Sequence, residues 1–211
     1  MLKNKLGQIL ILDTGINYDK IIMDSFIPST KNILGALITH SHNDHSKSMD
    51  ELENSGIDIY SYKTLKPLEK FTIDNFEIMT IPLVHNVYNI GFIIKDKLSG
   101  KKMVYATDTS AIPPIKNIDY WLMECNHTKA RMEYQIQKGS ESSIHLGNAM
   151  TNHFSLEKMI KYFQNEQVTK PEHLIACHLS NSTATKKDIL DRMQKYTNKL
   201  NIAKKGELYK L

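Results

Sequence analysis

The sequence predicts an α/β (α+β) chain built as a four-layer αββα sandwich, in which helices flank two mixed β-sheets. Short apolar runs rich in β-branched residues recur through the first half with short connections, as in a meandering sheet. Amphipathic helical patterns are concentrated in the second half. No Pro-, Gly- or Ser-rich linker and no repeat interrupts the sequence, so we expect a single domain over residues 1–211.

The first half is predicted to consist of strands around one short helix. Apolar runs predict strands over 8–15 and 32–39, each ending in a turn or loop. Residues 42–56 predict a loop and a short helix that ends at Gly56. Further strands are expected over 57–61, 70–83 (a hairpin turning at Asp74-Asn75), 89–96, 101–108 and 118–126.

The second half alternates helices and a strand. The apolar spacing of 155–163 predicts an amphipathic helix with a serine N-cap. A strand is expected over 171–178. The last helix is expected over 185–200, where Thr185 and Asp188 form a capping box.

Composition excludes several classes of protein. Hydrophobic residues make up 41% and charged residues 24%, which suits an ordinary globular core. Two cysteines are too few for a disulfide framework, and no run approaches the ~20 apolar residues of a membrane span, so we expect a cytoplasmic protein without membrane contact. Residues 186–211 hold eight Lys or Arg against three Asp or Glu, which suits a solvated helix or contact with a polyanion.

The chemistry is concentrated in "ITHSHNDHSKSM", residues 38–49. Its H-x-H-x-D-H pattern places His40, His42, Asp44 and His45 directly after an apolar strand. Imidazoles and carboxylates are the ligands that ions such as zinc prefer, so the pattern predicts metal binding. The alternative is a polar turn that is His-rich by chance.

A metal site needs ligands beyond one loop, and three later strand ends offer them. These are His85 in "IPLVHNV", Asp108 in "VYATDTS" and His178 in "LIACHLS". Each follows an apolar run, so side chains far apart in sequence can converge at one edge of a sheet. Taken singly, His85 and His178 could equally be core or loop histidines.

Asp13 in "ILILDTG" ends an earlier strand. Its carboxylate can accept a hydrogen bond from a ligand imidazole or orient the His-rich loop. We expect Asp13 to support the ligands rather than bind metal.

The order of these motifs resembles the metallo-β-lactamase fold superfamily over nearly the whole chain. The resemblance implies two divalent ions, with Zn²⁺ expected and Mn²⁺ the alternative, and a metal-bridging hydroxide as nucleophile. One ion would be bound by His40, His42 and His85, the other by Asp44, His45 and His178, with Asp108 bridging the two.

Three further stretches resemble tRNase Z and the YycJ/WalJ-like nucleases. "HNVYNIGF" resembles their third motif, in place of the glyoxalase and lactamase form, and "WLMECNH" resembles the strand that here carries Glu124 and His127. "SSIHLGNAMT" resembles their "GHLSN" loop. The resemblance implies that His145 protonates the leaving oxygen and that Glu124 holds His145 in place, with Asp44 a ligand that also serves catalysis.

"HLSNSTAT" resembles the terminal motif of the same proteins, which implies phosphate contacts from Ser180 and Asn181. His127 is expected to lie behind the ligands or near substrate. The sequence also departs from the pattern, because Ile144 and Gly147 replace the glycine and serine of the His145 loop. The short spacings between the motifs leave no room for the tRNA-gripping arm of tRNase Z or for a β-CASP domain.

The resemblance therefore implies a binuclear metal-dependent phosphodiesterase that cleaves nucleic acid in the manner of a nuclease. Three alternatives stay open: a cyclic-nucleotide phosphodiesterase like the phage anti-Pycsar enzymes, a small-molecule ester or lactone hydrolase, and a non-catalytic metal-binding protein on the same fold. The expected partner is the phosphodiester substrate, and the sequence leaves the oligomeric state open, a homodimer included.

Overall fold

A computed structural model describes residues 1–24, 26–139 and 142–210 of the chain. The chain divides into two compact units: unit 1 consists of Met1–Pro82 and Val87–Gly100, and unit 2 of Leu83–Asn86 and Lys101–Leu211. This division does not test the prediction of a single domain, which stays a prediction. Each unit carries its own β-structure and its own part of the predicted site.

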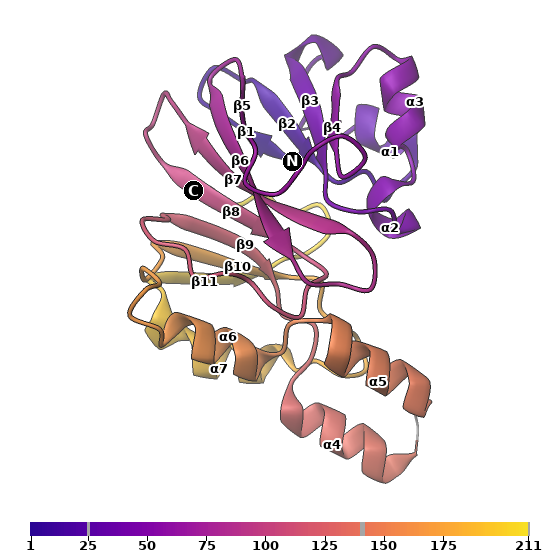
Figure 1. Cartoon of the computed structure of the whole chain (residues 1–211), viewed down its shortest axis with the longest axis vertical. Helices are drawn as coiled ribbons and strands as arrows, with labels where there is room; N and C mark the ends of the chain where they lie inside the picture. The colour runs from indigo at the N-terminus through magenta and orange to yellow at the C-terminus, as the bar shows by residue number, and fades with distance from the viewer. Residues whose placement is uncertain (25, 140–141, 211) are drawn as a thin grey trace. The chain divides into compact units, whose positions relative to one another are not determined.

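The first sheet of unit 1 has the strand order β1-β2-β3-β4 (Figure 1). Its strands are Leu2–Lys3, Ile9–Leu12, Ile33–Ile38 and Ile59–Ser61. β1 is antiparallel to β2, whereas β2, β3 and β4 run parallel, so the sheet is mixed. Helices α1 (Tyr18–Ile22) and α3 (Met49–Asn54) pack on strands β2 and β3. This packing buries the two strands and explains why the strand sequences are almost continuously apolar.

Strands β5 (Lys70–Ile73), β6 (Phe76–Leu83) and β7 (Asn89–Asp96) follow in sequence. β5 and β6 pair antiparallel about the predicted turn at Asp74-Asn75, where Asp74 has a φ of 47°. Alternate residues of β6 are buried over its first part, as expected for a strand with one face on a core. The rings of Tyr60 and Phe71 stack at 5.2 Å and connect β4 to β5.

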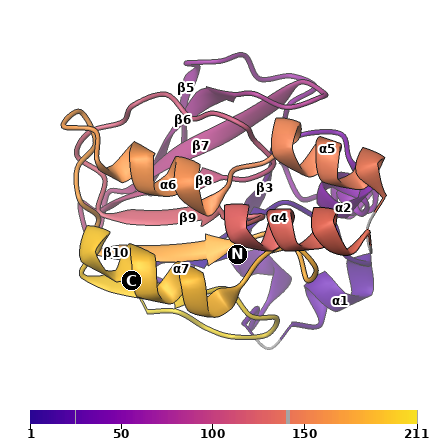
Figure 2. The ribbon, with the colours of Figure 1, turned by 90° about the horizontal axis from the view of Figure 1, so that it is seen from below.

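Unit 2 is built on four parallel strands in the order β8-β9-β10-β11. They comprise Lys102–Ala106, Tyr120–Glu124, His173–Cys177 and Lys199–Ile202. Helices α6 (Leu156–Phe163) and α7 (Lys186–Met193) lie along one face (Figures 1 and 2). Because the strands are parallel, the residues that follow β8, β9 and β10 emerge at one edge of the sheet, which is where α/β sheets place their sites.

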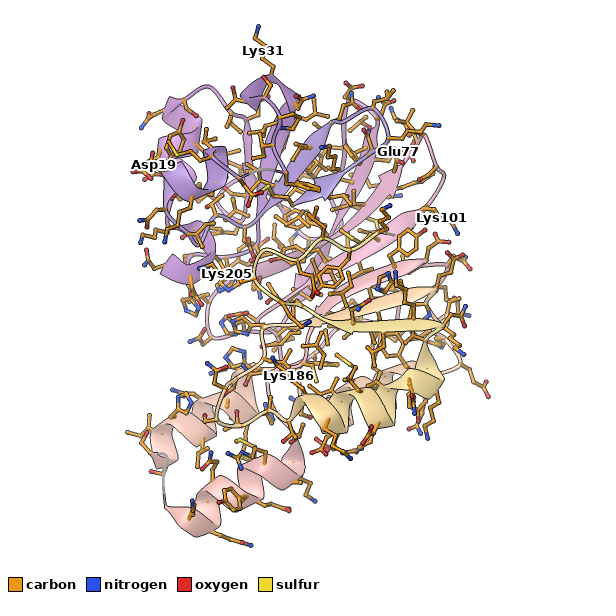
Figure 3. The ribbon with its side chains drawn as sticks, turned by 180° about the vertical axis from the view of Figure 1, so that it is seen from behind. Asp19, Lys31, Glu77, Lys101, Lys186 and Lys205 are labelled. Carbon is orange, nitrogen blue, oxygen red and sulfur yellow. The ribbon has the colours of Figure 1, made fainter. Side chains whose placement is uncertain are left out.

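At the opposite edge of this sheet, where the strands begin, Lys101 lies just before β8 and forms hydrogen bonds to residues of two neighbouring segments (Figure 3). Its Nζ lies 2.5 Å from Glu172 Oε1 and 2.9 Å from Asp119 Oδ1. These hydrogen bonds, to Glu172 first and Asp119 second, raise the pKa of Lys101 above its usual range. Since Asp119 and Glu172 directly precede β9 and β10, one cation fastens the starts of three neighbouring strands.

Helices α4 (Lys129–Lys138) and α5 (Ser143–Asn152) lie side by side in unit 2 (Figures 1 and 2). They share a small apolar cluster of Met132, Leu146 and Ala149. The sequence did not predict either helix, because so few apolar positions give only a weak helical stripe. Among the described helices none has the length and apolar character needed to cross a bilayer.

The prediction of a last helix over 185–200 is wrong beyond Met193. α7 ends there, a 3₁₀ turn follows, and β11 then pairs with β10. Thr197 and Asn198 are weak helix formers, so the gain of a strand ladder outweighs the apolar spacing. Thr185 is the N-cap of α7, but its side chain makes no capping hydrogen bond, so the predicted capping box is not formed.

The serine N-cap predicted for 155–163 is confirmed. Ser155 Oγ accepts a hydrogen bond from the backbone N–H of Lys158 at 3.1 Å, at the start of α6. The face of α6 that carries Leu156 and Met159 is fully buried. The rings of Tyr162 and Phe163 lie 5.4 and 5.6 Å from that of Trp121 in β9, which fixes the helix on the sheet.

Candidate metal centre

In unit 1 the His-rich loop, residues 38–49, is organised by the carboxylate of Asp13. Oδ2 lies 2.7 Å from His45 Nδ1, and Oδ1 accepts a hydrogen bond from the backbone N–H of Thr39 at 2.8 Å. Thr39 Oγ1 lies 3.0 Å from Asp13 Oδ2 and 3.0 Å from His40 Nδ1. One carboxylate therefore orients His45 directly and His40 through the Thr39 hydroxyl, which is the supporting role expected of Asp13.

Gly15, in the same "LDTG" segment, lets the backbone pass against the loop. A Cβ at Gly15 would lie 1.5 Å from the carbonyl oxygen of Asp44, so any side chain would push α2 (Asn43–Ser46) away. The backbone N–H of Thr14 donates to His45 O at 2.7 Å. The segment thus holds both the side chains and the backbone of the loop.

The loop presents ring nitrogens with the spacing of metal ligands. His40 Nε2 and His42 Nδ1 lie 3.1 Å apart, and two nitrogens bound to one tetrahedral zinc ion lie about 3.3 Å apart. Asp44 Oδ2 lies 3.7 Å from His45 Nε2, and the Asp44 side chain is 68% exposed. His40 and His45 are buried, so the loop combines fixed imidazoles with an accessible carboxylate.

In unit 2 four predicted residues and His153, which was not predicted, form a strand-end cluster that consists of His85, Asp108, Glu124, His153 and His178. Asp108 and His178 have φ angles of 50° and 53°, in the left-handed region, and Asp13 of unit 1 has 56°. Six non-glycine residues in the described ranges have a positive φ, and these three are half of them. Backbone strain of this kind, about 1–3 kcal/mol each, is concentrated at functional sites.

The carboxylate of Asp108 faces two different imidazoles. Its Oδ1 lies 3.2 Å from His178 Nε2, and its Oδ2 lies 4.0 Å from His85 Nε2. The Thr107 hydroxyl donates to Oδ1 at 2.9 Å, and the Asp108 side chain is only 4% exposed. Two oxygens directed to two imidazoles are what a carboxylate shared by two ions requires.

The far nitrogens of these imidazoles are fixed by acceptors. His85 Nδ1 lies 3.2 Å from the carbonyl oxygen of Asn152, and His178 Nδ1 lies 2.9 Å from Glu124 Oε1. With Nδ1–H donating, the lone pair of Nε2 is directed at Asp108. Together with the same arrangement at His40 and His45, this is how proteins orient metal-binding histidines, so the residues fit a metal.

Glu124, at the end of β9, is fully buried. Oε1 lies 2.5 Å from His153 Nδ1 and 2.9 Å from His178 Nδ1, and Oε2 accepts the backbone N–H groups of Thr109 and Phe154 at 3.0 and 3.1 Å. Burial acts to raise the pKa of Glu124, but the hydrogen bonds from the two histidines outweigh it and lower the pKa to about 2. Glu124 is therefore a carboxylate at neutral pH.

His153 is the site residue that sequence reasoning missed. Its ring stacks on His178 at 5.4 Å and meets His85 edge-on at 5.5 Å. One ligand-type atom from each of Asp108, Glu124, His153 and His178 lies within 4.8 Å of the others. One sequence signal could have pointed to His153. In "NHFS" this histidine stands two residues before Ser155, the N-cap of α6, and therefore in a loop at the start of a helix.

The predicted contact between His145 and Glu124 is wrong. His145 is exposed on α5, and the four hydrogen bonds to the Glu124 carboxylate come from His153, His178 and two backbone amides. The match of "SSIHLGNAMT" rested on a histidine that the helix turns outward. The catalytic role assigned to His145 stays a prediction, and the geometry at Glu124 favours His153 for it.

The remaining predicted residues, His127, Ser180 and Asn181, lie in loops of unit 2. His127 is buried, and its carbonyl oxygen accepts the N–H of Leu156; burial, followed by the nearby Lys158, lowers the pKa of its imidazole. Ser180 Oγ accepts the N–H of Thr183 at 3.3 Å in the turn after β10, whereas Asn181 is exposed. Substrate contacts by His127, Ser180 and Asn181 stay predictions.

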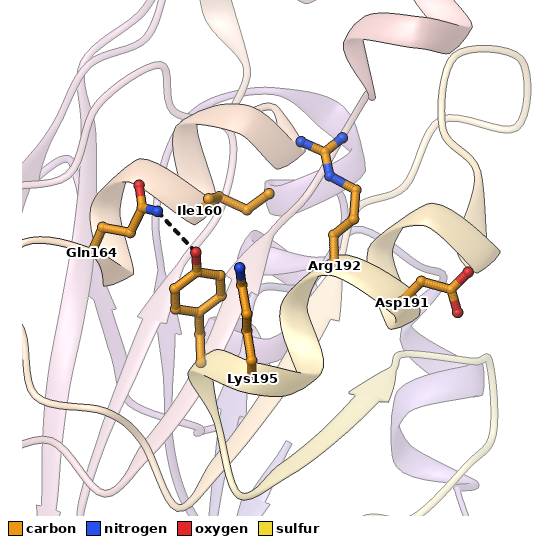
Figure 4. A pocket seen from close by; sticks show the side chains of 6 residues that line it. Ile160, Gln164, Asp191, Arg192 and Lys195 are labelled. Atoms are coloured by element: carbon orange, nitrogen blue, oxygen red, sulfur yellow. Dashed lines mark hydrogen bonds between the residues drawn. The ribbon is translucent and has the colours of Figure 1, made fainter.

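A surface hollow of about 340 Å³ lies between α6 and α7 (Figure 4). A hydrogen bond of 2.9 Å from Gln164 Nε2 to the Tyr196 hydroxyl crosses it. It is lined by Ile160, Gln164, Asp191, Arg192, Lys195 and Tyr196. None of these is a candidate ligand, so the hollow is separate from the strand-end cluster.

Comparison with known proteins identifies the fold. No protein-family model and no curated protein matches the sequence. The metallo-β-lactamase fold protein YhfI from Bacillus subtilis matches with a TM-score of 0.72 and 15% identity, over 98% of this chain and 89% of that one. The human short-form tRNase Z, ELAC1, matches at 0.62 and 14%, over 99% and 90%.

A diphosphatase of the PhnP family matches with a TM-score of 0.57 and 12% identity, over 93% of this chain and 77% of that one. Likeness at this level of identity shows the fold. The chain therefore has the metallo-β-lactamase fold, which confirms the predicted fold class.

Proposed function

Given the metallo-β-lactamase fold, we propose that this chain is a metal-dependent hydrolase that cleaves phosphodiester bonds, with nucleic acid as its substrate. The observation that carries the proposal is Asp108, whose two oxygens face His85 and His178 while each imidazole is fixed through its other nitrogen. Proteins named tRNase Z and diphosphatase share the fold, which supports phosphoryl chemistry.

The proposed ligands follow the order of the sequence motifs. His40, His42 and His85 would hold one divalent ion, and Asp44, His45 and His178 the second, with Asp108 shared. The geometry inside each unit supports its own part of this set. Imidazole and carboxylate donors suit Zn²⁺, with Mn²⁺ the alternative. Bound ions would supply an activated water and neutralise charge on the phosphate oxygens.

His153 is proposed as the residue that donates a proton to the leaving oxygen. Its Nδ1 is held by Glu124 at 2.5 Å, which leaves Nε2 as the nitrogen able to reach a substrate. The buried carboxylate of Glu124 fixes the orientation of the His153 ring, which is how a carboxylate assists a catalytic histidine. We propose His153 for the role that the family resemblance implied for His145.

The test is turnover of bis-p-nitrophenyl phosphate, single-stranded DNA, RNA and p-nitrophenyl acetate by the chain loaded with Zn²⁺ or Mn²⁺. We expect cleavage of the three phosphodiesters, none in excess EDTA, and no comparable turnover of the acetate. Turnover of the acetate alone would establish an ester hydrolase instead. Phosphodiester cleavage undiminished by EDTA would exclude the proposed metal dependence.

A cyclic-nucleotide phosphodiesterase is the second candidate. The weak charge favours it, because the net charge is only +4 and residues 1–185 carry a net −1. A polymer-cleaving enzyme that neutralises several phosphates loses affinity steeply with salt, whereas a small cyclic substrate does so far less. Turnover of cyclic nucleotides that exceeds polymer cleavage and is insensitive to salt would select this second candidate.

A further inference from the structure

The segment that contains helices α4 and α5 begins and ends beside residues of the strand-end cluster. α4 begins at the N-cap Thr128, four residues after Glu124. α5 ends at Asn152, whose carbonyl oxygen lies 3.2 Å from His85 Nδ1, and the next residue, His153, contacts Glu124. Both ends of this segment are therefore attached to candidate site residues.

α4 is also fastened along its side. Arg131 Nε and Gln135 Nε2 both donate to the carbonyl oxygen of Ser182 at 2.8 Å. Ser182 lies four residues after His178, and the N–H of Thr128 donates to Thr183 O at 2.9 Å in the same turn. α4 is thus held on the turn that follows a predicted ligand, so its outer face is presented in a fixed position relative to the cluster.

That outer face carries an aromatic ring with two cations. Tyr134 is 42% exposed, the Arg131 guanidinium carbon lies 4.8 Å from its ring centroid, and Lys138 Nζ lies 5.4 Å from it. Positions 131, 134 and 138 are neighbours on one side of a helix. Within the described ranges neither cation forms an ion pair with a carboxylate, so both keep charge for an outside partner.

We propose that Arg131, Tyr134 and Lys138 form a strand-binding face for single-stranded nucleic acid. The inference rests on the proposed function and names the form of its substrate. Exposed aromatic rings stack on unpaired bases, and neighbouring Arg and Lys side chains neutralise the backbone phosphates. A single strand suits the face because the bases of a duplex are covered by stacking, and a cyclic mononucleotide has no chain to extend along α4.

The test is fluorescence anisotropy of labelled single-stranded DNA and RNA with the full chain in EDTA, so that no strand is cut. We expect Tyr134→Ala to weaken binding roughly 5- to 100-fold and Tyr134→Phe to retain it, because stacking needs only the ring. Lys138→Gln should reduce the slope of log affinity against log salt by about one. The matched control is Lys195→Gln, which removes a lysine 5.0 Å from the ring of Tyr196 on another surface and should leave binding unchanged.

The outcomes separate this inference from the proposed function. Metal-dependent cleavage of bis-p-nitrophenyl phosphate by the wild type, with full strand affinity in Tyr134→Ala, would overturn the strand-binding face and leave the hydrolase. Loss of strand affinity in Tyr134→Ala, with no metal-dependent turnover by the wild type, would leave the face and overturn the hydrolase. Equal weakening by Lys138→Gln and Lys195→Gln would show nonspecific charge attraction and contradict the face.

Discussion

The His-rich loop of unit 1 and the strand-end cluster of unit 2 each use one buried carboxylate to orient side chains. In the loop, Asp13 fixes His45 directly and His40 through the Thr39 hydroxyl. In the cluster, Glu124 contacts His178 and His153 directly. Both carboxylates sit behind imidazoles with the Nδ1 atom toward them, which leaves Nε2 to bind.

The two regions differ in the histidines that their carboxylates orient. Asp13 supports two predicted ligands, whereas Glu124 supports one ligand, His178, and one histidine outside the predicted ligand set, His153. Under the proposed assignment, Asp13 orients only metal ligands, whereas Glu124 orients one ligand and one histidine that is proposed to transfer a proton. A buried carboxylate behind an imidazole can therefore support either a ligand or a proton donor, depending on which histidine it holds.

The largest expected effect follows from removing the shared carboxylate. Asp108→Ala should lower the kcat for bis-p-nitrophenyl phosphate by at least about 10³-fold, because metal-ion catalysis contributes several kcal/mol. The matched control is Asp50→Ala, which removes an aspartate whose side chain is 79% exposed on α3 and should leave kcat unchanged. An Asp108→Ala chain with wild-type kcat would end the two-metal proposal.

The next effect separates His153 from His145. His153→Ala should slow cleavage of a dinucleotide by about 10²-fold, because the alkoxide that leaves the dinucleotide needs a proton. The same variant should slow bis-p-nitrophenyl phosphate far less, since p-nitrophenolate leaves unprotonated. His145→Ala serves as the control, with a small effect on both substrates. If His145→Ala shows the leaving-group dependence and His153→Ala does not, the assignment drawn from the sequence was right.

Replacing the two supporting carboxylates tests the comparison itself. Asp13→Asn and Glu124→Gln should each weaken metal affinity about 10- to 100-fold, the usual cost of losing such a partner. Competition with a chromophoric chelator measures the affinity of each ion. If both ions keep wild-type affinity in both variants, the carboxylates do not orient ligands.

Acid titration of the metal-free chain tests whether Glu124 is ionised in the folded state. The pKa of Glu124 is lowered to about 2, so its charge stabilises the fold above the ordinary pKa near 4.5 and that stability is lost as the pH falls through about 2. Glu124→Gln should therefore be less stable than the wild type by roughly 3 kcal/mol at pH 7, with the gap closing in acid. Urea unfolding across this pH range measures the gap, and a constant gap would contradict the ionised Glu124.

The smallest effect is expected at the Thr39 relay. Thr39→Val removes only the hydroxyl that connects Asp13 to His40, so metal affinity should fall by about three- to tenfold, less than in Asp13→Asn. Isothermal titration with Zn²⁺ measures this loss. A loss as large as that of Asp13→Asn would mean that Asp13 acts mainly through Thr39.

Much of this architecture was predictable because the signals were local. The strand runs around β2, β3, β6 and β10 and the H-x-H-x-D-H loop are continuous in sequence. The other predicted ligands could be found because each follows an apolar strand. Thr39 and Gly15 sit inside the recognised motifs, but their contacts depend on how two segments approach in space.

The features that escaped prediction depend on contacts between distant segments. α4 and α5 are held largely by hydrogen bonds to other loops, such as those from Arg131 and Gln135 to Ser182, rather than by a broad apolar face. His153 becomes significant only because α5 returns it to Glu124. The end of the last helix was misplaced because β11 gains its ladder from β10, which no helical periodicity reveals.

The number of zinc ions bound per chain tests whether Asp108 is shared by two metal ions. The chain would be equilibrated with excess Zn²⁺, freed of unbound metal by gel filtration and analysed for bound zinc by mass spectrometry. We expect two ions per chain in the wild type and fewer in Asp108→Ala, with a folded circular dichroism spectrum for both. A folded wild-type chain that retains no zinc, or binds the same amount as Asp108→Ala, would contradict this expectation.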